Sequence, residues 1–303
     1  AMRLSHDGVA NQARLCSNES SGREFTMGKL KFNRIFSAGA LATTLVVSGC
    51  ASVQTTQSGA VGVERQQYMS GLVSEQALQQ EAAQQYNSLL SQARAQGKLD
   101  TNAAQTRRVQ NIAQRLIAQA GVFRPDAAQW NWEVHVLNDN QVNAWCMPGG
   151  KIAVYSGLIN RLNPTDDELA AVIGHEIAHA LREHSREQVS QQMATQLGLS
   201  VLAAVTGSQA SANLGNALTN VMFTLPNSRT HEIEADRIGT ELAARAGYNP
   251  NAAVTLWQKM AALDRGNAPP EFLSTHPSPD TRIQDLQVIA NQVMPLYERT
   301  QGR

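Results

Sequence analysis

Residues 175–179 read HEIAH, and this short stretch decides how the fold is interpreted. Side chains four positions apart lie on one face of an α-helix about one turn apart, so His175 and His179 can bind the same ion. Glu176 follows the first histidine and would face water at that ion, whose proton it could accept. The same pattern also arises by chance on solvated helices. Apolar residues on both sides of the segment indicate a buried helix and favour the metal site.

The helix that carries this segment has a recognisable start. Thr165 is followed by two aspartates and then by Glu168, which is the spacing of a capping box, and acidic side chains stabilise the first turn of a helix. We therefore expect one continuous helix from Thr165 to about Glu187.

A catalytic zinc site needs a third protein ligand and an open position. His184 comes five residues after His179, which on a continuing helix places it about 140° away around the axis, so we interpret it as a structural or surface histidine. Glu232 begins a second predicted helix, at about 228–246, and is the better third ligand. The alternative for Glu232 is a solvated acidic residue that the helix dipole stabilises.

Two more acidic residues accompany Glu232. Asp236 comes four positions later and shares its helix face, where it could accept the free ring N–H of a ligand histidine and fix the tautomer of that ring. Glu234 lies about 200° around the helix from Glu232 and should point elsewhere. The predicted site is one Zn²⁺ per chain, held by His175, His179 and Glu232, with Asp236 behind the ligands.

The N-terminal sequence predicts export and lipidation. Residues 1–26 are polar and without period, and we interpret them as a non-native or mis-set extension. Residues 27–49 have the basic start and the short apolar run of a secretory signal peptide, and Cys50 follows Val-Ser-Gly as in a bacterial lipobox. The alternative is an uncleaved anchor with a cytosolic tail. The small, polar stretch 50–62 predicts a flexible tether, and 63–303 form the main domain.

The residues after the lipobox cysteine predict which of the two bacterial membranes holds the protein. Cys50 is followed by Ala51 and Ser52, so no aspartate signals retention at the inner membrane. We expect the mature protein on the periplasmic face of the outer membrane, held there by its lipid rather than by a spanning helix.

Composition and periodicity predict an α+β fold. Aromatic residues make up only 5% of the chain, and the abundance of Ala, Gln and Leu favours helices, first at about 64–96 and 103–120. Alternating polar and apolar residues at 130–136, followed by two further predicted strands near 142–147 and 151–155, predict one small antiparallel sheet. The 25 basic and 25 acidic residues leave no basic excess, which argues against a nucleic-acid partner.

Several segments share a family pattern. Beyond HEIAH, the chain contains EIEAD at 232–236, NAW at 143–145, PGGKIAVYSGLI at 148–159 and DDELAAVIGHE at 166–176. Together these segments resemble the HtpX/Oma/LoiP-type gluzincin metallopeptidases, and most closely the periplasmic lipoprotein (LoiP-like) members. The resemblance implies a zincin-like, mostly helical fold, a Zn²⁺ ion and cleavage of misfolded or membrane-associated envelope proteins.

The resemblance also implies roles for residues outside HEIAH. In this family the strand before the active helix pairs with extended substrate, and Asn143, Ala144 and Trp145 match that strand, although Trp145 could instead belong to the core. His276 lies in a loop stiffened by two prolines and matches a His-Pro that in some members approaches the zinc. Its ring could fill the open position on the metal, donate a hydrogen bond to the developing oxyanion, or pack against the last helix.

The function expected from these residues is zinc-dependent endoproteolysis of polypeptides, with 63–303 as the metallopeptidase domain and Glu176 as the base. A protein of another class fits the same ligands: a non-catalytic zinc-binding envelope chaperone or assembly lipoprotein, in which four protein ligands would close the site. Hydrolysis of an unfolded substrate with and without a chelator distinguishes the two.

Overall fold

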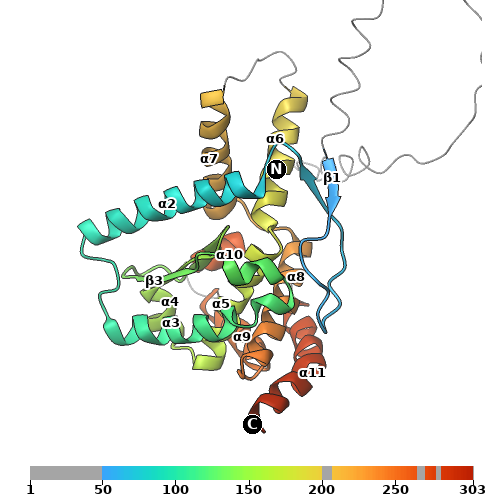
Figure 1. Cartoon of the computed structure of the whole chain (residues 1–303). Coiled ribbons are helices and arrows are strands. Elements are labelled where there is room, and N and C mark those ends of the chain that lie inside the picture. Colours follow the sequence, from blue (N-terminus) through green and yellow to red (C-terminus); the bar gives the residue numbers. More distant parts are fainter. Residues whose placement is uncertain (1–49, 200–206, 265–269, 278–280, 303) are drawn as a thin grey trace, which may run out of the picture. The chain divides into compact units, whose positions relative to one another are not determined.

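The computed structural model describes residues 50–199, 207–264, 270–277 and 281–302, so the expectations for 1–49 lie outside the described residues. Helices dominate the described part and surround a small sheet (Figure 1). The expected α+β, mostly helical fold of the zincin type is therefore confirmed.

The central sheet has three strands. In spatial order they are β3 (Glu133–Leu137), β5 (Lys151–Tyr155) and β4 (Ala144–Met147). β4 and β5 form an antiparallel hairpin through Gly149 and Gly150, whose φ angles of 78° and 82° favour glycine. β5 lies between the other strands and runs parallel to β3. The expectation of a wholly antiparallel sheet is wrong, because alternation identifies strands but not their order across a sheet.

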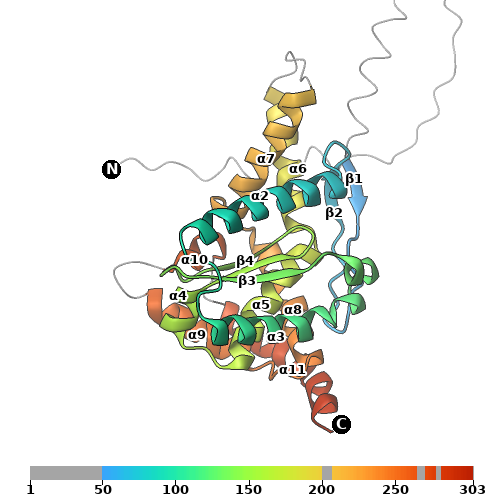
Figure 2. The same cartoon turned by 60° about the vertical axis from the view of Figure 1, so that its left-hand side comes forward.

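Helices cover both faces of this sheet (Figure 2). α2 (Glu75–Ala95) packs on one face, and α3 (Ala103–Ile117) and α5 (Asp166–Leu181) pack on the other. Side chains of β4 alternate between the two sides: Trp145 belongs to the core under α2, whereas Cys146 belongs to the larger core under α5. The sheet thus separates two apolar clusters, and the HEIAH helix lies on the larger one.

Further helices follow along the chain. They are α4 (Ser156–Leu162), α6 (His184–Leu199), α7 (Gly207–Phe223), α8 (Arg229–Arg245), α9 (Ala252–Asp264), α10 (Glu271–Thr275) and α11 (Arg282–Gln301), with 3₁₀ turns at Ala120–Val122 and Pro125–Gln129. α6 and α7 lie side by side and project from the sheet region (Figures 1 and 2). Within the described ranges, every helix is too short or too polar to cross a membrane.

The HEIAH helix begins as predicted but ends early. Its first turn has the predicted capping box. The helix ends at Leu181, and Glu183 then adopts a left-handed backbone with a φ of 52° before α6 begins at His184. The expectation of a continuous helix to residue 187 is wrong, because the left-handed residue interrupts the helical hydrogen bonds and redirects the chain.

α8 crosses α5 at two glycines. A Cβ atom on Gly239 would lie 2.6 Å from the backbone nitrogen of His175, and one on Gly174 would lie 2.8 Å from the carbonyl oxygen of Gly239. Only glycine permits so close an approach of two backbones. Because α8 also carries Glu232 and Asp236, the crossing brings both carboxylates to the HEIAH segment.

The segment expected to be a flexible tether packs on the domain. β1 (Cys50–Val53) pairs antiparallel with β2 (Gln67–Ser70). β2 lies in the range 64–96, for which the sequence analysis predicted a helix. Thr56 is buried, and the backbone N–H of Val61 donates to Glu241 Oε2 at 2.9 Å. The composition indicated small, polar residues, but it could not indicate that distant helices supply partners for them.

Candidate metal centre

Four buried side chains from three segments converge beside the α5–α8 crossing. The candidate ligand atoms of His175, His179, Glu232 and His276 all lie within 4.8 Å of one another. His179 Nε2 lies 3.0 Å from His175 Nε2 and 3.3 Å from Glu232 Oε1. Imidazole nitrogens with one carboxylate are a donor set that suits zinc. The structure therefore brings together the three predicted ligands, and it adds His276 to the same group.

His175 is held from behind by Asp236, as the sequence suggested. His175 Nδ1 lies 2.9 Å from Asp236 Oδ1, so the ring N–H donates to the carboxylate and Nε2 faces the cluster, where it could bind a metal ion. Although burial opposes ionisation, Arg282 and His175 hold the pKa of Asp236 below its usual value. This carboxylate is therefore ionised and fixes the orientation of the ligand ring.

Arg282 is a site residue that the sequence analysis missed. Its guanidinium donates to Glu232 Oε2 at 2.8 Å and to Asp236 Oδ1 at 2.7 Å, and it lies 3.4 Å from the centre of the Trp257 ring. A buried cation between two carboxylates offsets their mutual repulsion. An arginine in the first turn of a mixed polar and apolar helix has no local signal of burial, so no sequence pattern identifies it.

His179 is held from behind by another histidine. His179 Nδ1 lies 2.8 Å from His184 Nδ1, and His184 Nε2 lies 3.0 Å from Glu234 Oε2. The expectation that His184 faces away from His179 is wrong, because the break at Glu183 turns α6 back toward the cluster. Burial lowers the pKa of His179 to about 3 and that of His184 well below its usual value, so both rings are neutral.

Glu176 lies beside the cluster with an unpaired oxygen. Its Oε1 is buried, has no hydrogen-bond partner among the described residues, and lies 3.4 Å from His276 Nε2. Burial raises the pKa of Glu176. A buried polar atom without a partner is costly unless a ligand or water completes it. The unpaired oxygen beside a zinc-type donor set is what we expect where a metal ion and a reacting water belong.

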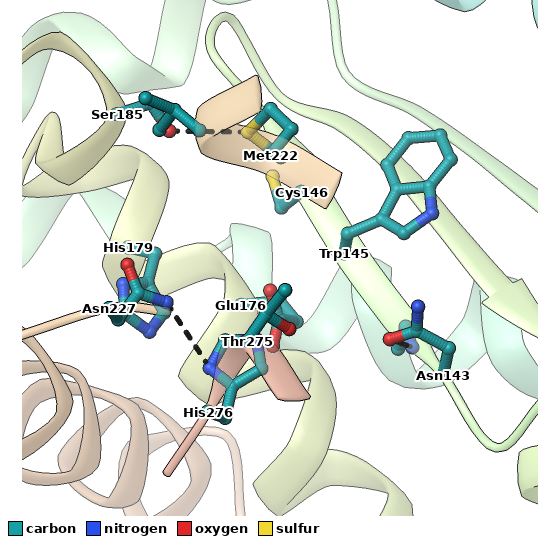
Figure 3. Close-up of a pocket in the computed structure, with 12 residues that line it drawn as sticks. Asn143, Trp145, Cys146, Glu176, His179, Ser185, Met222, Asn227, Thr275 and His276 are labelled. Atoms are coloured by element: carbon teal, nitrogen blue, oxygen red, sulfur yellow. Dashed lines mark hydrogen bonds and ion pairs between the residues drawn. The ribbon is translucent and has the colours of Figure 1, made fainter. Parts of the chain in front are cut away.

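His276 reaches the cluster from the loop after α10. Its Nδ1 lies 3.0 Å from Glu232 Oε1 and 3.3 Å from His175 Nε2. The ring stacks on Phe272 at 4.2 Å between centroids, and Asn227 Nδ2 lies 3.4 Å from the same Nδ1 (Figure 3). The ring is therefore within reach of the ion that the other donors would hold.

A pocket beside the cluster has β4 and the end of α7 as its other walls (Figure 3). The lining includes all three residues predicted for the substrate strand, Asn143, Ala144 and Trp145. β4 is an outer strand of the sheet. The indole of Trp145 also packs against Tyr86 and Phe223, with centroid distances of 5.8 and 5.6 Å, so this side chain contributes to the core as well.

The chain is similar to known proteins over this region. The profile of Peptidase family M48 matches residues 103–290. Mitochondrial metalloendopeptidase OMA1 is 39% identical over 174 residues in Arabidopsis thaliana (57% of this chain, 35% of that protein) and 38% identical over 181 residues in Schizosaccharomyces pombe (59% and 51%). The beta-barrel assembly-enhancing protease of Yersinia pestis is 33% identical over 217 residues (67% and 43%).

The matched part of the chain contains the whole donor cluster, Glu176 and Arg282. The alignments span between about a third and a half of the length of these relatives.

Proposed function

This chain belongs to peptidase family M48, and from that premise we propose that it is a zinc-dependent endopeptidase. The observation that carries the proposal is the unpaired Glu176 oxygen beside a zinc-type donor set. The names of the relatives, metalloendopeptidase and protease, support hydrolysis of peptide bonds. The proposed substrates are misfolded or membrane-associated envelope proteins.

In the proposed mechanism His175, His179 and Glu232 hold the zinc, and Asp236 orients the first of them. Bound there, zinc supplies a Lewis acid that polarises the scissile carbonyl and acidifies water. Glu176 accepts the proton of the attacking water and passes it to the leaving amine. The burial that raises the pKa of Glu176 suits this double role, because a base that must later act as an acid works best with a pKa nearer to neutral.

We propose that substrate binds along β4 as an added strand. The outer position of β4 and its place in the wall of the pocket support this binding mode. Backbone hydrogen bonds would give affinity with little demand on sequence, which suits a peptidase for misfolded chains. Asn143, Ala144 and Trp145 would then contribute mainly through their backbone.

One observation favours the non-catalytic alternative. His276 gives the cluster a fourth potential ligand, and four protein ligands are typical of structural zinc sites. In a zinc-binding chaperone or assembly lipoprotein, all four side chains would bind the ion permanently and leave no open position for water or substrate. The peptidase function accounts better for Glu176, which is not in the donor group and whose buried Oε1 has no hydrogen-bond partner among the described residues.

Casein hydrolysis by purified protein tests the two functions. The peptidase should cleave casein, lose this activity with a chelator and regain it with zinc. Glu176→Gln should keep both zinc and fold yet lose hydrolysis, because only the base is removed. Cleavage by Glu176→Gln at the wild-type rate would show that the assigned base is wrong, and zinc binding without any casein cleavage would favour the chaperone.

We further propose that the mature protein begins at a lipidated Cys50 and lies on the periplasmic face of the outer membrane. The lipobox-like sequence supports this location, and so does similarity to a protease whose name refers to β-barrel assembly. Cys50→Ala should move the protein from the membrane fraction to the soluble fraction. Continued sedimentation with membranes would contradict lipid anchoring.

A further inference from the structure

His184 connects a predicted zinc ligand to a buried ion cluster. Its ring is only 1% exposed, and both ring nitrogens have partners: Nδ1 lies 2.8 Å from His179 Nδ1, and Nε2 lies 3.0 Å from Glu234 Oε2. The carboxylate of Glu234 in turn accepts from Arg65 at 2.6 Å and from Arg182 at 2.9 Å. A continuous chain of hydrogen bonds therefore runs from the ligand ring to two arginines.

The direction of each hydrogen bond follows from the cluster. His179 presents Nε2 to the other donors, so a metal ligand there needs its lone pair on Nε2 and its proton on Nδ1. That N–H can donate only to an unprotonated Nδ1 of His184. The proton of His184 then lies on Nε2, where the carboxylate of Glu234 accepts it. One arrangement of protons satisfies all three residues.

We propose that His184 and Glu234 position His179 and fix its tautomer for zinc binding. His175 has a comparable but shorter chain of hydrogen bonds, since its Nδ1 contacts Asp236 directly and Arg282 donates to Asp236. On the side of His179 an imidazole is inserted between ligand and carboxylate. Each ligand ring is thus connected to an anion that arginine stabilises, which orients the ring and raises its basicity.

The plane of the His184 ring is also fixed. His231 stacks on it at 4.2 Å between centroids and 12° between planes, and His231 Nε2 lies 3.1 Å from Glu187 Oε2. Glu187 accepts from Arg65 as Glu234 does, but in the described structure it makes no bond to His184. Both acidic residues of this buried cluster accept from Arg65, but only Glu234 contacts the histidine behind the predicted ligand, and Glu187 instead accepts from His231 and Gln67.

The inference rests on the proposed zinc site but not on peptidase activity, so zinc affinity of the metal-free protein is the appropriate measurement. His184→Asn and His184→Leu have similar size and leave similar space. Asparagine can place its amide oxygen near the former Nδ1 and accept from His179, whereas leucine cannot. We expect a chelator competition titration to show about 10- to 100-fold weaker zinc binding for His184→Leu, and binding near the wild-type level for His184→Asn.

Glu234→Gln and Glu187→Gln form the second matched pair. Both remove a buried carboxylate bonded to Arg65, so both should lower the melting temperature of the metal-free protein. We expect only Glu234→Gln to weaken zinc binding, by about tenfold, because it alone weakens the acceptor of His184.

Equal zinc affinity in His184→Leu and His184→Asn, or equal losses in the two glutamine variants, would overturn the positioning role and leave His184 as packing. Absence of zinc binding by the wild type would instead overturn the proposed site itself. A third outcome is that the wild type binds zinc but does not hydrolyse casein, while zinc affinity still differs within each of the two pairs of variants. That result would refute the peptidase function and leave the positioning role intact.

Discussion

The position of His276 bears on whether the donor cluster could be open to substrate. Its Nδ1 lies among the candidate ligand atoms and its Nε2 lies near Glu176, so the ring occupies the space that water and a scissile carbonyl would need. This position favours the plug among the roles that the sequence left open. An oxyanion donor would have to move aside first and then point at the substrate.

We therefore expect His276→Ala to raise basal casein hydrolysis, because the open position on the metal would become free. The rate should be measured together with the zinc content, since a fourth ligand also contributes to affinity. A fall in kcat by about a hundredfold with zinc retained would instead assign the ring to the oxyanion. An unchanged rate with unchanged zinc would leave only the packing role.

At the scale of elements, the α5–α8 crossing sets the geometry of the ligands. In Gly239→Ala the new Cβ would lie 2.6 Å from the backbone nitrogen of His175, so the helices must separate. We expect a loss of about 1–3 kcal/mol in the free energy of unfolding and weaker zinc binding, because Glu232 moves with α8. Urea unfolding and zinc titration measure the two effects.

Gly121→Ala is the control, since an added Cβ there meets no atom of the described residues within 4 Å. This variant should keep wild-type zinc affinity. If Gly239→Ala binds zinc as tightly as Gly121→Ala, the crossing does not determine the ligand distances.

α6 contributes a second element-scale property, which is sensitivity to acid. Although burial opposes ionisation, hydrogen bonds from Arg65, His231 and Gln67 hold the pKa of Glu187 well below its usual value. A carboxylate of this kind stabilises the fold above its unfolded pKa of about 4.3, and the contribution disappears as the pH falls toward the folded pKa. Lower pH should therefore remove the advantage of an ionised Glu187.

We expect the difference in unfolding free energy between wild type and Glu187→Gln to be largest near neutral pH and to shrink below about pH 4. Urea unfolding at several pH values measures it. Glu298→Gln, at an exposed position of α11, should match the wild type throughout. A difference that stays constant with pH would mean that the ionised state of Glu187 contributes nothing.

The elements that sequence could predict are those with a local signal. The capping box and the apolar period identified α5, and the i,i+4 spacing in HEIAH and EIEAD selected His175, His179, Glu232 and Asp236. His184 could not be placed, because its direction depends on one left-handed residue, Glu183, whose conformation has no glycine or asparagine to signal it. The expected angle of about 140° between His179 and His184 assumes one continuous helix, but α5 ends at Leu181, before His184.

At the scale of the whole molecule, tertiary packing accounts for what sequence missed. The mixed order of the sheet, the packed segment after β1 and the buried cation of α11 all depend on partners distant in the sequence. The predicted ligands, too, come from α5, α8 and the loop after α10, so their convergence is a property of the complete domain. An ion bound among them connects these parts and should stabilise the domain as a unit.

Removal of zinc tests this connection. A ligand that binds only the folded state adds about 4 kcal/mol at a thousandfold excess over its Kd, so a chelator should lower the melting temperature of the wild type. His175→Ala, which lacks one ligand, should start near that lower temperature and respond little. Glu176→Gln should respond as the wild type does, because Glu176 binds no metal in the proposed site. If the chelator shifts His175→Ala as far as the wild type, the stabilising ion lies elsewhere and the assigned ligands are wrong.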